Sequence, residues 1–127
     1  MKKVLLVDDN DALLFAFKKL SQFHDFTVET ANSLEMALRM VASNRYDVLL
    51  TDLNLTGFAT HDGYEIVKAA KIVNHDIRAY IWTAYDGDIE REESSKLGVK
   101  RFLAKPVSFD ALLSIINEDA ASNGSQA

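Results

Sequence analysis

Five polar residues that could take part in metal or phosphate chemistry follow short apolar runs in this sequence. They are Asp8, Asp9, Asp52, Thr83 and Lys105, at the ends of the runs over residues 4–7, 48–51, 79–83 and 101–104. Three carboxylates held together repel one another, and their pKa values rise unless a cation joins them. Because the sequence has no cysteine and no histidine cluster, oxygen atoms would be the ligands, which suits a hard cation such as Mg²⁺. The pattern therefore predicts a site for a divalent cation.

The lysine and the threonine of this set favour phosphate chemistry at the same site. Mg²⁺ keeps several of its waters and is commonly shared with a phosphate group. An ammonium and a hydroxyl, which Lys105 and Thr83 would supply, stabilise the equatorial oxygens of a phosphoryl group during transfer. Asp52 is then the candidate nucleophile, and its product would be a covalent aspartyl phosphate.

The segments between these residues predict the elements that must position them. Short runs without helical spacing predict strands over residues 4–7, 26–30, 48–51, 79–83 and 101–104. Each strand is followed by a segment that predicts a helix, because its apolar residues recur three or four positions apart. These apolar positions are Leu13, Phe17 and Leu20; Leu34, Ala37, Leu38 and Val41; Ile66, Ala69, Ala70 and Val73; and, in the fifth helix, Phe109, Leu112, Leu113 and Ile116.

Residue types at the helix ends indicate where some of these helices begin. Asn32, with a glutamate three residues later, resembles a capping box, and Ser108 is placed to cap the fifth helix. The fourth helix, expected over residues 86–97, has a thin apolar stripe in which Ile89 and Leu97 are nearly alone. We expect it to be the least stable helix, because little apolar surface holds it in place.

The order of the elements predicts an α/β fold. Strands with continuous apolar runs indicate a parallel sheet with helices on both faces, which right-handed crossovers place there. Only residues 26–30 alternate polar and apolar side chains, which suits an edge strand in a doubly wound, flavodoxin-like, five-stranded sheet of order 2-1-3-4-5. Ligands bind such a sheet at the switch point between the first and third strands, where Asp8 and Asp52 would lie.

The composition excludes several classes of protein and partner. A chain of 127 residues with 48% hydrophobic residues suits one domain with a hydrophobic core. Its net charge of −5 gives no general attraction to nucleic acid or to an anionic membrane, so neither is an expected direct partner. The lack of cysteine excludes disulfides and thiolate chemistry. An acidic pair follows the first apolar run too early for a signal peptide, so a cytoplasmic protein is expected.

Taken together, the motifs resemble a known family. In chain order they are Asp8-Asp9, Asp52, Thr83-Ala84 and Lys105-Pro106. This arrangement looks like a response regulator receiver domain of two-component signalling, and the resemblance covers roughly residues 2–120. We therefore expect a receiver domain over residues 1–121 and a disordered tail over residues 122–127.

The resemblance implies a signalling phosphoacceptor rather than an enzyme. Asp52 would take a phosphoryl group from a histidine kinase or a histidine phosphotransfer protein, and the domain would assist its own phosphorylation and dephosphorylation. The phosphorylated form would bind a downstream protein through the face made by the fourth helix, fifth strand and fifth helix. The chain would be a monomer or a phosphorylation-dependent dimer.

The resemblance also implies a role for each site residue. Mg²⁺ would be bound by Asp8, Asp9, Asp52 and the backbone carbonyl of Asn54, and the phosphoryl group would contact Thr83 and Lys105. Thr83 and Phe102 would form the switch. Access to the site would be tuned by Asn54, Thr56 and Tyr85. The Lys105–Pro106 bond would be cis, although only about 5–6% of X-Pro bonds are. A cis bond turns the chain sharply and lets Lys105 point back into the acidic crevice.

The segment after Asp52 departs from the family pattern. The family usually has a proline four residues after the phosphoacceptor, where this chain has Thr56. It also reaches an Asp-Gly pair about three residues sooner than this chain reaches Asp62-Gly63. We therefore expect this longer loop to alter the fit to a kinase and the access of water.

Two other functions match part of the pattern. A phosphatase of the haloacid dehalogenase type also uses Mg²⁺ and an aspartyl phosphate, and Asp9-Asn10-Asp11 matches its D-x-D motif. That family expects Thr or Val where Leu13 stands. A flavodoxin-type flavin carrier shares the expected fold, but the acidic pair would repel the flavin phosphate. Within the receiver interpretation, a free-standing protein, a phosphorelay intermediate and a part of a longer chain all remain open.

A purely structural role would also explain each residue taken alone. The acidic pair would stabilise a helix N-terminus by ~0.3–1 kcal/mol, and Phe102 would be an ordinary core aromatic. The histidines at positions 24, 61 and 75 show no ligand spacing, so surface placement is expected for each. The coincidence of reactive types at four strand ends is what favours a functional site.

Overall fold

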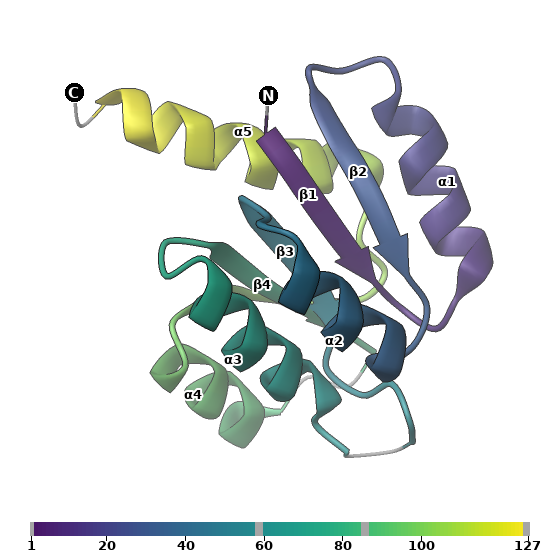
Figure 1. Cartoon of the computed structure of the whole chain (residues 1–127), viewed down its shortest axis with the longest axis vertical. Helices are drawn as coiled ribbons and strands as arrows, with labels where there is room; N and C mark the ends of the chain where they lie inside the picture. Colours follow the sequence, from purple (N-terminus) through teal and green to yellow (C-terminus); the bar gives the residue numbers. More distant parts are fainter. Residues whose placement is uncertain (1, 58–59, 85–86, 126–127) are drawn as a thin grey trace.

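Five strands alternate with five helices in the computed structural model (Figure 1). The structure describes residues 2–57, 60–84 and 87–125, with side chains described to residue 117. The strands are β1 (Lys2–Val7), β2 (Phe26–Ala31), β3 (Val48–Asp52), β4 (Arg78–Thr83) and β5 (Val99–Ala104). The helices are α1 (Asp11–Ser21), α2 (Leu34–Ser43), α3 (Asp62–Val73), α4 (Asp88–Lys96) and α5 (Phe109–Ser125).

The strands form one parallel sheet in the order β2-β1-β3-β4-β5, which confirms the predicted α/β fold. Helices α1 and α5 pack on one face, and α2, α3 and α4 lie on the other (Figure 1). Because β1 and β3 are adjacent, with Val7 opposite Thr51, the residues that follow Val7 meet the end of β3. This is the switch point at which ligands bind in such sheets.

Burial on both faces of the sheet explains why the strand sequences contain unbroken apolar runs. Val4 and Leu6 of β1 belong to the core layer under α1 and α5, whereas Leu5 and Val7 belong to the layer under α2 and α3. All four side chains are fully buried. A strand covered on both faces has no side open to water, so it shows no polar alternation.

The cap of α2 differs from the prediction. Ser33, not Asn32, is the N-cap residue, and its side chain accepts a hydrogen bond from the Met36 amide at 3.1 Å. The Asn32 side chain instead donates to Asp11 Oδ1 at 2.9 Å. The predicted cap of α5 is confirmed, because Ser108 Oγ accepts from the Ala111 amide at 3.1 Å.

Several apolar residues expected in the core lie at the surface. Leu20 is 44% exposed, Val73 36% and Ile89 68%. The expected apolar stripe of α4 was therefore wrong for Ile89, and the buried residue of this helix is Ser94. The α4 backbone is helical from Asp88, whereas residue 86 lies outside the described residues.

The last two elements differ from the prediction at their ends. Strand β5 begins at Val99, two residues before the expected start. Helix α5 runs through Ser125, past the start of the tail expected from residue 122, and the domain boundary at residue 121 stays a prediction. In the described part of the chain, no helix combines the length and the apolar character needed to cross a membrane.

Candidate functional site

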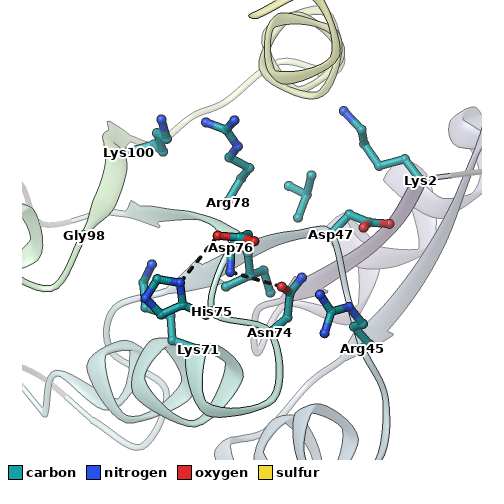
Figure 2. Close-up of a pocket in the computed structure, with 12 residues that line it drawn as sticks. Lys2, Arg45, Asp47, Lys71, Asn74, His75, Asp76, Arg78, Gly98 and Lys100 are labelled. Atoms are coloured by element: carbon teal, nitrogen blue, oxygen red, sulfur yellow. Dashed lines mark hydrogen bonds and ion pairs between the residues drawn. The ribbon is translucent and has the colours of Figure 1, made fainter. Parts of the chain in front are cut away.

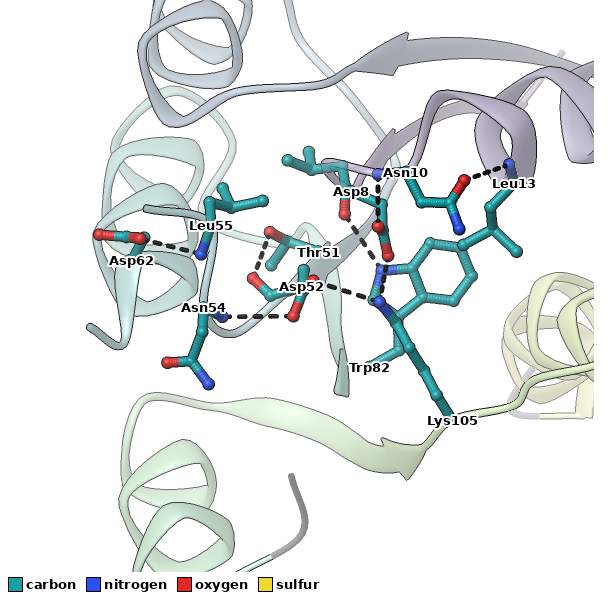
Figure 3. Close-up of polar contacts among 11 residues, drawn as sticks. Asp8, Asn10, Leu13, Thr51, Asp52, Asn54, Leu55, Asp62, Trp82 and Lys105 are labelled. Atoms are coloured by element: carbon teal, nitrogen blue, oxygen red, sulfur yellow. Dashed lines mark hydrogen bonds and ion pairs between the residues drawn. The ribbon is translucent and has the colours of Figure 1, made fainter. Parts of the chain in front are cut away.

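The predicted site residues meet at the carboxyl ends of the strands (Figure 3). Asp8 follows β1, Asp52 ends β3, Thr83 ends β4 and Lys105 follows β5. Figure 3 shows Asp8, Asp52 and Lys105 pointing toward one another. The parallel sheet brings them together because every strand ends at the same edge.

Three carboxylates form the acidic part of this site. Asp8, Asp9 and Asp52 each offer one oxygen, and these oxygens lie within 4.8 Å of one another. Asp8 is fully buried and Asp52 is 6% exposed, whereas Asp9 is open to solvent. The cluster therefore has two buried members that hold a fixed position and one member at the entrance.

Lys105 bridges the two buried carboxylates. Its Nζ donates to Asp8 Oδ2 and to Asp52 Oδ2, the second at 3.2 Å. Burial alone would lower the pKa of Lys105, but the hydrogen bond to Asp8 and the charges of both carboxylates raise it above its usual value. Lys105 is thus an ammonium at neutral pH. The bond from Lys105 to Pro106 is cis, as predicted.

The environment of Asp52 disfavours its charge when no metal is bound. Burial raises the pKa of Asp52 above its usual value, and the charge of Asp8 adds to this effect. The charge of Lys105 and a hydrogen bond from the Asn54 amide to Asp52 Oδ1, at 3.2 Å, oppose the rise only in part. A further cation beside the cluster would favour the charged carboxylate.

The two residues predicted to form a switch lie on neighbouring strands. Thr83 is buried, and its carbonyl accepts a hydrogen bond from the Lys105 amide at 2.8 Å. Phe102 on β5 is half-buried against the core cluster of Leu53, Tyr64 and Ile81. The Arg91 guanidinium carbon lies 5.1 Å from the centroid of the Phe102 ring. Tyr85, the third residue expected near this region, lies outside the described residues.

The long loop after β3 is organised by Asp62, which the sequence reasoning missed as a functional residue. Four hydrogen bonds converge on Asp62 Oδ2: from the Leu55 amide at 2.9 Å, the Thr56 amide at 2.7 Å, Thr56 Oγ1 at 3.0 Å and Thr60 Oγ1 at 2.7 Å. Burial would raise the pKa of Asp62, but these hydrogen bonds together lower it. In the sequence, the feature that pointed to Asp62 was the Asp62-Gly63 pair at the end of the loop.

The other half of this loop contacts α4 through His61. The Asn54 side-chain oxygen accepts from the His61 amide at 2.8 Å, and His61 has a left-handed φ of 58°. His61 Nε2 lies 3.4 Å from Glu90 Oε2. His61 is half-buried, so the expected surface placement was wrong for this histidine, whereas those at positions 24 and 75 are exposed. His61 thus joins the end of the loop to Glu90 of α4, and its ring also lies 5.4 Å, between centroids, from that of Tyr64 in α3.

A comparison with known families decides how this arrangement is classified. Residues 4–117 match the family model of the response regulator receiver domain. The chain belongs to this family. A curated relative, sporulation initiation phosphotransferase F of Bacillus subtilis (strain 168), is 34% identical over 113 residues, covering 87% of each chain.

A longer relative agrees with this receiver assignment, and solved structures share the fold. The response regulator MprA of Mycobacterium leprae is 31% identical over 114 residues, and the receiver spans about half (49%) of its length. A CheY-like receiver domain protein from Methanospirillum hungatei JF-1 has a TM-score of 0.87 at 24% identity, covering 100% of this chain and 99% of that one. A receiver domain protein from Clostridium thermocellum has a TM-score of 0.80 at 25% identity, with full coverage of both chains.

The receiver site does not fit the phosphatase alternative. That function needs Asp9 as nucleophile and Asp11 beside it in the site. Asp11 begins α1, and its Oδ1 accepts the hydrogen bond from Asn32 rather than facing the cluster. The receiver family and the position of Asp11 therefore both argue against the phosphatase alternative.

Proposed function

We propose that Asp52 of this receiver domain accepts a phosphoryl group from a histidine kinase or a histidine phosphotransfer protein in a Mg²⁺-dependent reaction. The observation that carries the proposal is the position of Lys105, whose Nζ contacts both Asp8 and Asp52 inside a cluster of three carboxylates. A cation placed beside the nucleophile suits a transferred group with negative charge on its outer oxygens.

The carboxylate cluster fits Mg²⁺. Its donors are oxygen atoms within 4.8 Å of one another, and oxygen is the ligand type that Mg²⁺ prefers. Asp8, Asp9 and Asp52 would hold the ion with the backbone carbonyl of Asn54. When bound, Mg²⁺ would offset the carboxylate charge and would supply Lewis-acid stabilisation of the phosphoryl charge.

The residues of the chain supply the remaining chemistry. A carboxylate oxygen of Asp52 attacks phosphorus as the bond from phosphorus to the donor atom breaks, and the electron pair of that bond leaves on the donor. Lys105 stabilises the charge on the transferred oxygens, and the hydroxyl of Thr83 donates to one of them. The domain thus assists its own phosphorylation and the later hydrolysis, and it signals rather than turns over a metabolite.

Two loop residues would control access to Asp52. The Asn54 backbone amide donates a hydrogen bond to Asp52, and the Asn54 side-chain oxygen accepts one from the His61 amide. Thr56 stands where the family usually has proline, and both its backbone amide and its hydroxyl donate hydrogen bonds to Asp62. These bonds hold the loop beside the nucleophile, so Asn54 and Thr56 would set how water and a kinase approach. Tyr85, which lies outside the described residues, is proposed to tune access with them.

The output face would be α4, β5 and α5. Phosphorylation draws Thr83 toward the new oxygens, and Phe102 rotates inward, which is a shift between two populated states. Helix α4 offers little resistance because Ser94 is its buried residue among those described. A downstream protein, or a second copy of the phosphorylated chain, would bind this face, and a cytoplasmic location stays the expectation from the sequence.

Phosphorylation by acetyl phosphate tests the site. Intact mass spectrometry of the wild-type chain with Mg²⁺ should show one added phosphoryl group, and removal of Mg²⁺ should abolish it. Asp52→Asn should show none, and Asp9→Asn should need more Mg²⁺. Asp11→Asn removes a nearby carboxylate outside the cluster and should behave as wild type. An equal adduct on Asp52→Asn would exclude the proposed nucleophile.

Hydrogen exchange tests the output face. Beryllofluoride with Mg²⁺ mimics the phosphoryl group, and the exchange rates of amides in α4 and β5 should change most. Phe102→Leu should reduce the change in β5 while leaving the mass of the acetyl phosphate adduct unaltered. Changes confined to α1 would contradict the assignment of this face.

A further inference from the structure

A basic cavity lies at the end of the sheet opposite to the carboxylate cluster (Figure 2). Its volume is about 790 Å³, and its walls come from the starts of β1, β3, β4 and β5 and from the end of α3 with the turn that follows it. Asp52 ends β3, whereas Val48, which begins β3, lines this cavity. The length of the strand therefore separates the two places.

Positive charge gathers in this cavity although the whole chain is acidic. Five of the 14 Lys and Arg side chains line it, against two of the 19 Asp and Glu side chains. The cations are Lys2, Arg45, Lys71, Arg78 and Lys100, and the carboxylates are Asp47 and Asp76. Figure 2 shows these side chains arranged around one opening. Such a concavity raises the local concentration of anions.

Four of the five cations lack a carboxylate partner in the part of the chain that the structure describes. These four are Lys2, Arg45, Lys71 and Lys100. Among the described residues, no Asp or Glu oxygen lies within 4.0 Å of their charged nitrogens. Lys2 Nζ donates to the Ile116 carbonyl at 2.9 Å, and Arg45 Nη1 donates to the Val73 carbonyl at 3.3 Å. These bonds position two of the cations without neutralising them.

The two carboxylates of the cavity have other partners. Asp47 Oδ2 accepts a hydrogen bond from the backbone amide of Lys3 at 2.8 Å. Asp76 Oδ1 lies 3.4 Å from His75 Nδ1, and both of these side chains are at least 90% exposed. Among the described residues, neither carboxylate forms an ion pair with any of the four cations, and the lining keeps five cations against two carboxylates.

A glycine leaves room for one of the cations. Gly98 has a φ of +84°, and an ideal Cβ atom on it would lie 3.2 Å from Lys71 Nζ. Any larger residue there would be strained and would crowd the ammonium. Gly98 thus leaves space for the Lys71 ammonium at the wall of the cavity.

We propose that this cavity binds a small polyphosphate anion. Its volume lies within the range of about 300–1,000 Å³ that is usual for small-ligand sites. Several cations from separate elements match a ligand with several negative charges, and a guanidinium such as that of Arg45 binds phosphate oxygens well. Among the described residues that line it, none is Phe, Tyr or Trp. The positive charge of the lining therefore points to phosphate groups as what the cavity recognises.

Two features argue against a long nucleic acid as the ligand. The chain has a net charge of −5, so an extended polyanion would be repelled beyond the cavity. The five cations of the lining are gathered at one end of the sheet, which suits a compact anion better than an extended one. A compact anion would meet the positive lining of the cavity without meeting the rest of the acidic surface.

Titration with inorganic tripolyphosphate in metal-free buffer tests the site by backbone amide NMR. Without a metal ion, the carboxylate cluster repels the same probe, so binding there is suppressed. Amides of Val48, Ile77 and Lys100 should shift, and added salt should weaken the binding. The double variant K71Q/K100Q should bind at least about tenfold more weakly, because two charge-assisted contacts are lost. K18Q/K19Q removes the same charge from α1 and should bind as wild type.

The outcomes separate the proposal from general charge attraction and from the phosphoacceptor function. ATP that binds as tightly as tripolyphosphate would identify the phosphate chain as the ligand, and tighter ATP binding would identify a nucleotide. The proposal would be overturned by equal weakening of tripolyphosphate binding in K18Q/K19Q or by shifts confined to the amides near Asp52. It would also be overturned if no binding of tripolyphosphate were seen at about 10 mM. Should K71Q/K100Q lose its native circular dichroism spectrum, Arg45→Gln replaces it with the same expected loss. Acetyl phosphate labelling of Asp52 should be unchanged in these variants.

Discussion

An ideal Cβ atom on Gly63 would lie 2.6 Å from the backbone carbonyl oxygen of Asp52. The first turn of α3 therefore approaches the end of β3 more closely than a residue with a side chain permits. The Gly63 amide also donates to the Leu53 carbonyl at 2.9 Å. The strand that carries Asp52 and the helix that ends the long loop are thus joined by direct backbone contact.

Gly63→Ala should destabilise the domain by about 1–3 kcal/mol, because the obstacle is backbone that must move. The better helix propensity of alanine offsets at most about 1 kcal/mol of this cost. Urea unfolding followed by circular dichroism measures the difference. Gly57→Ala is the matched control, because among the described residues its Cβ would meet only Thr60 Cγ2, at 3.6 Å, and it should be near neutral. Equal stability of the two variants would contradict the close approach.

Asp62→Asn should lower the free energy of unfolding by about 1.5–3 kcal/mol, because a charged acceptor of four hydrogen bonds is lost. The loop from Leu55 to Thr60 should also become more open to hydrogen exchange. Glu65→Gln removes a neighbouring exposed charge from the same helix turn and should change stability little. Equal protection of the Thr56 amide in wild type and Asp62→Asn would argue against the central role of Asp62.

The effect of Asp62 should depend on pH. Burial would raise the pKa of this carboxyl, but its hydrogen bonds lower it in the folded chain below the ordinary value of 3.8. Such a group stabilises the fold above its unfolded pKa, and the stabilisation is lost as the pH falls through the folded pKa. The difference between wild type and Asp62→Asn should therefore be constant near about pH 7 and shrink below about pH 4. Unfolding curves that diverge on acidification would contradict this sign.

Asp52→Asn should make the metal-free chain at least as stable as wild type at neutral pH. Burial raises the pKa of Asp52 in the folded chain above 3.8, so folding favours its neutral form. Stability from this group is present below the unfolded pKa and is lost as the pH rises toward the folded pKa. The side-chain amide of the Asp52→Asn variant carries no charge, so the variant avoids this loss of stability.

The same variant should respond weakly to Mg²⁺. At about 100 times the dissociation constant, Mg²⁺ would stabilise wild type by about 2.7 kcal/mol, and thermal unfolding would show it. Asp11→Asn should respond as wild type. Because Lys105 Nζ lies 5.7 Å from the centroid of the Trp82 ring, the fluorescence of this tryptophan gives a second signal of metal binding. Equal stabilisation of Asp52→Asn would exclude Asp52 as a ligand.

His61 and Glu90 should be energetically coupled. His61 Nε2 lies 3.4 Å from Glu90 Oε2, with side-chain exposures of 29% and 13%. A double-mutant cycle with His61→Ala and Glu90→Ala should give a coupling energy of about 0.5–1 kcal/mol. Alanine is preferred to glycine because the left-handed φ of His61 would itself favour glycine.

The exposed pair Lys96 and Glu92 on α4 is the control for this cycle. Its atoms lie 3.8 Å apart, with side-chain exposures of 73% and 71%, so water screens it. Its coupling energy should be at most about 0.5 kcal/mol. If both pairs give the same value, the contact between the loop and α4 carries no special energy.

The sequence by itself determined the sheet and the carboxyl-end site. Residues 4–7 and 48–51 form buried strands because their unbroken apolar runs need cover on both faces. Once the strands are parallel, Asp8 and Asp52 must meet at adjacent strand ends, whatever the helices between them contain. Local pattern and topology therefore sufficed to predict the three-carboxylate cluster and the nearby lysine.

Only the tertiary structure decided the contacts made by the long loop and by the start of α2. Asp62 and Thr56 are six residues apart, and no spacing rule says that their groups converge, because loop geometry depends on where α3 packs. His61 was expected at the surface, yet it is half-buried and contacts Glu90 of α4, and that contact joins residues 29 positions apart. Asn32 and Ser33 are both good capping residues, and the helix start at Leu34 selected between them.

The basic cavity is another feature that the sequence alone did not predict. Its cations are scattered from Lys2 to Lys100, and each reads in the sequence as an ordinary surface charge. The amino ends of the parallel strands gather them, as the carboxyl ends gather the acidic residues. A sequence pattern records neighbours along the chain, whereas charge density depends on neighbours in space, so the net charge of −5 concealed a local excess of positive charge.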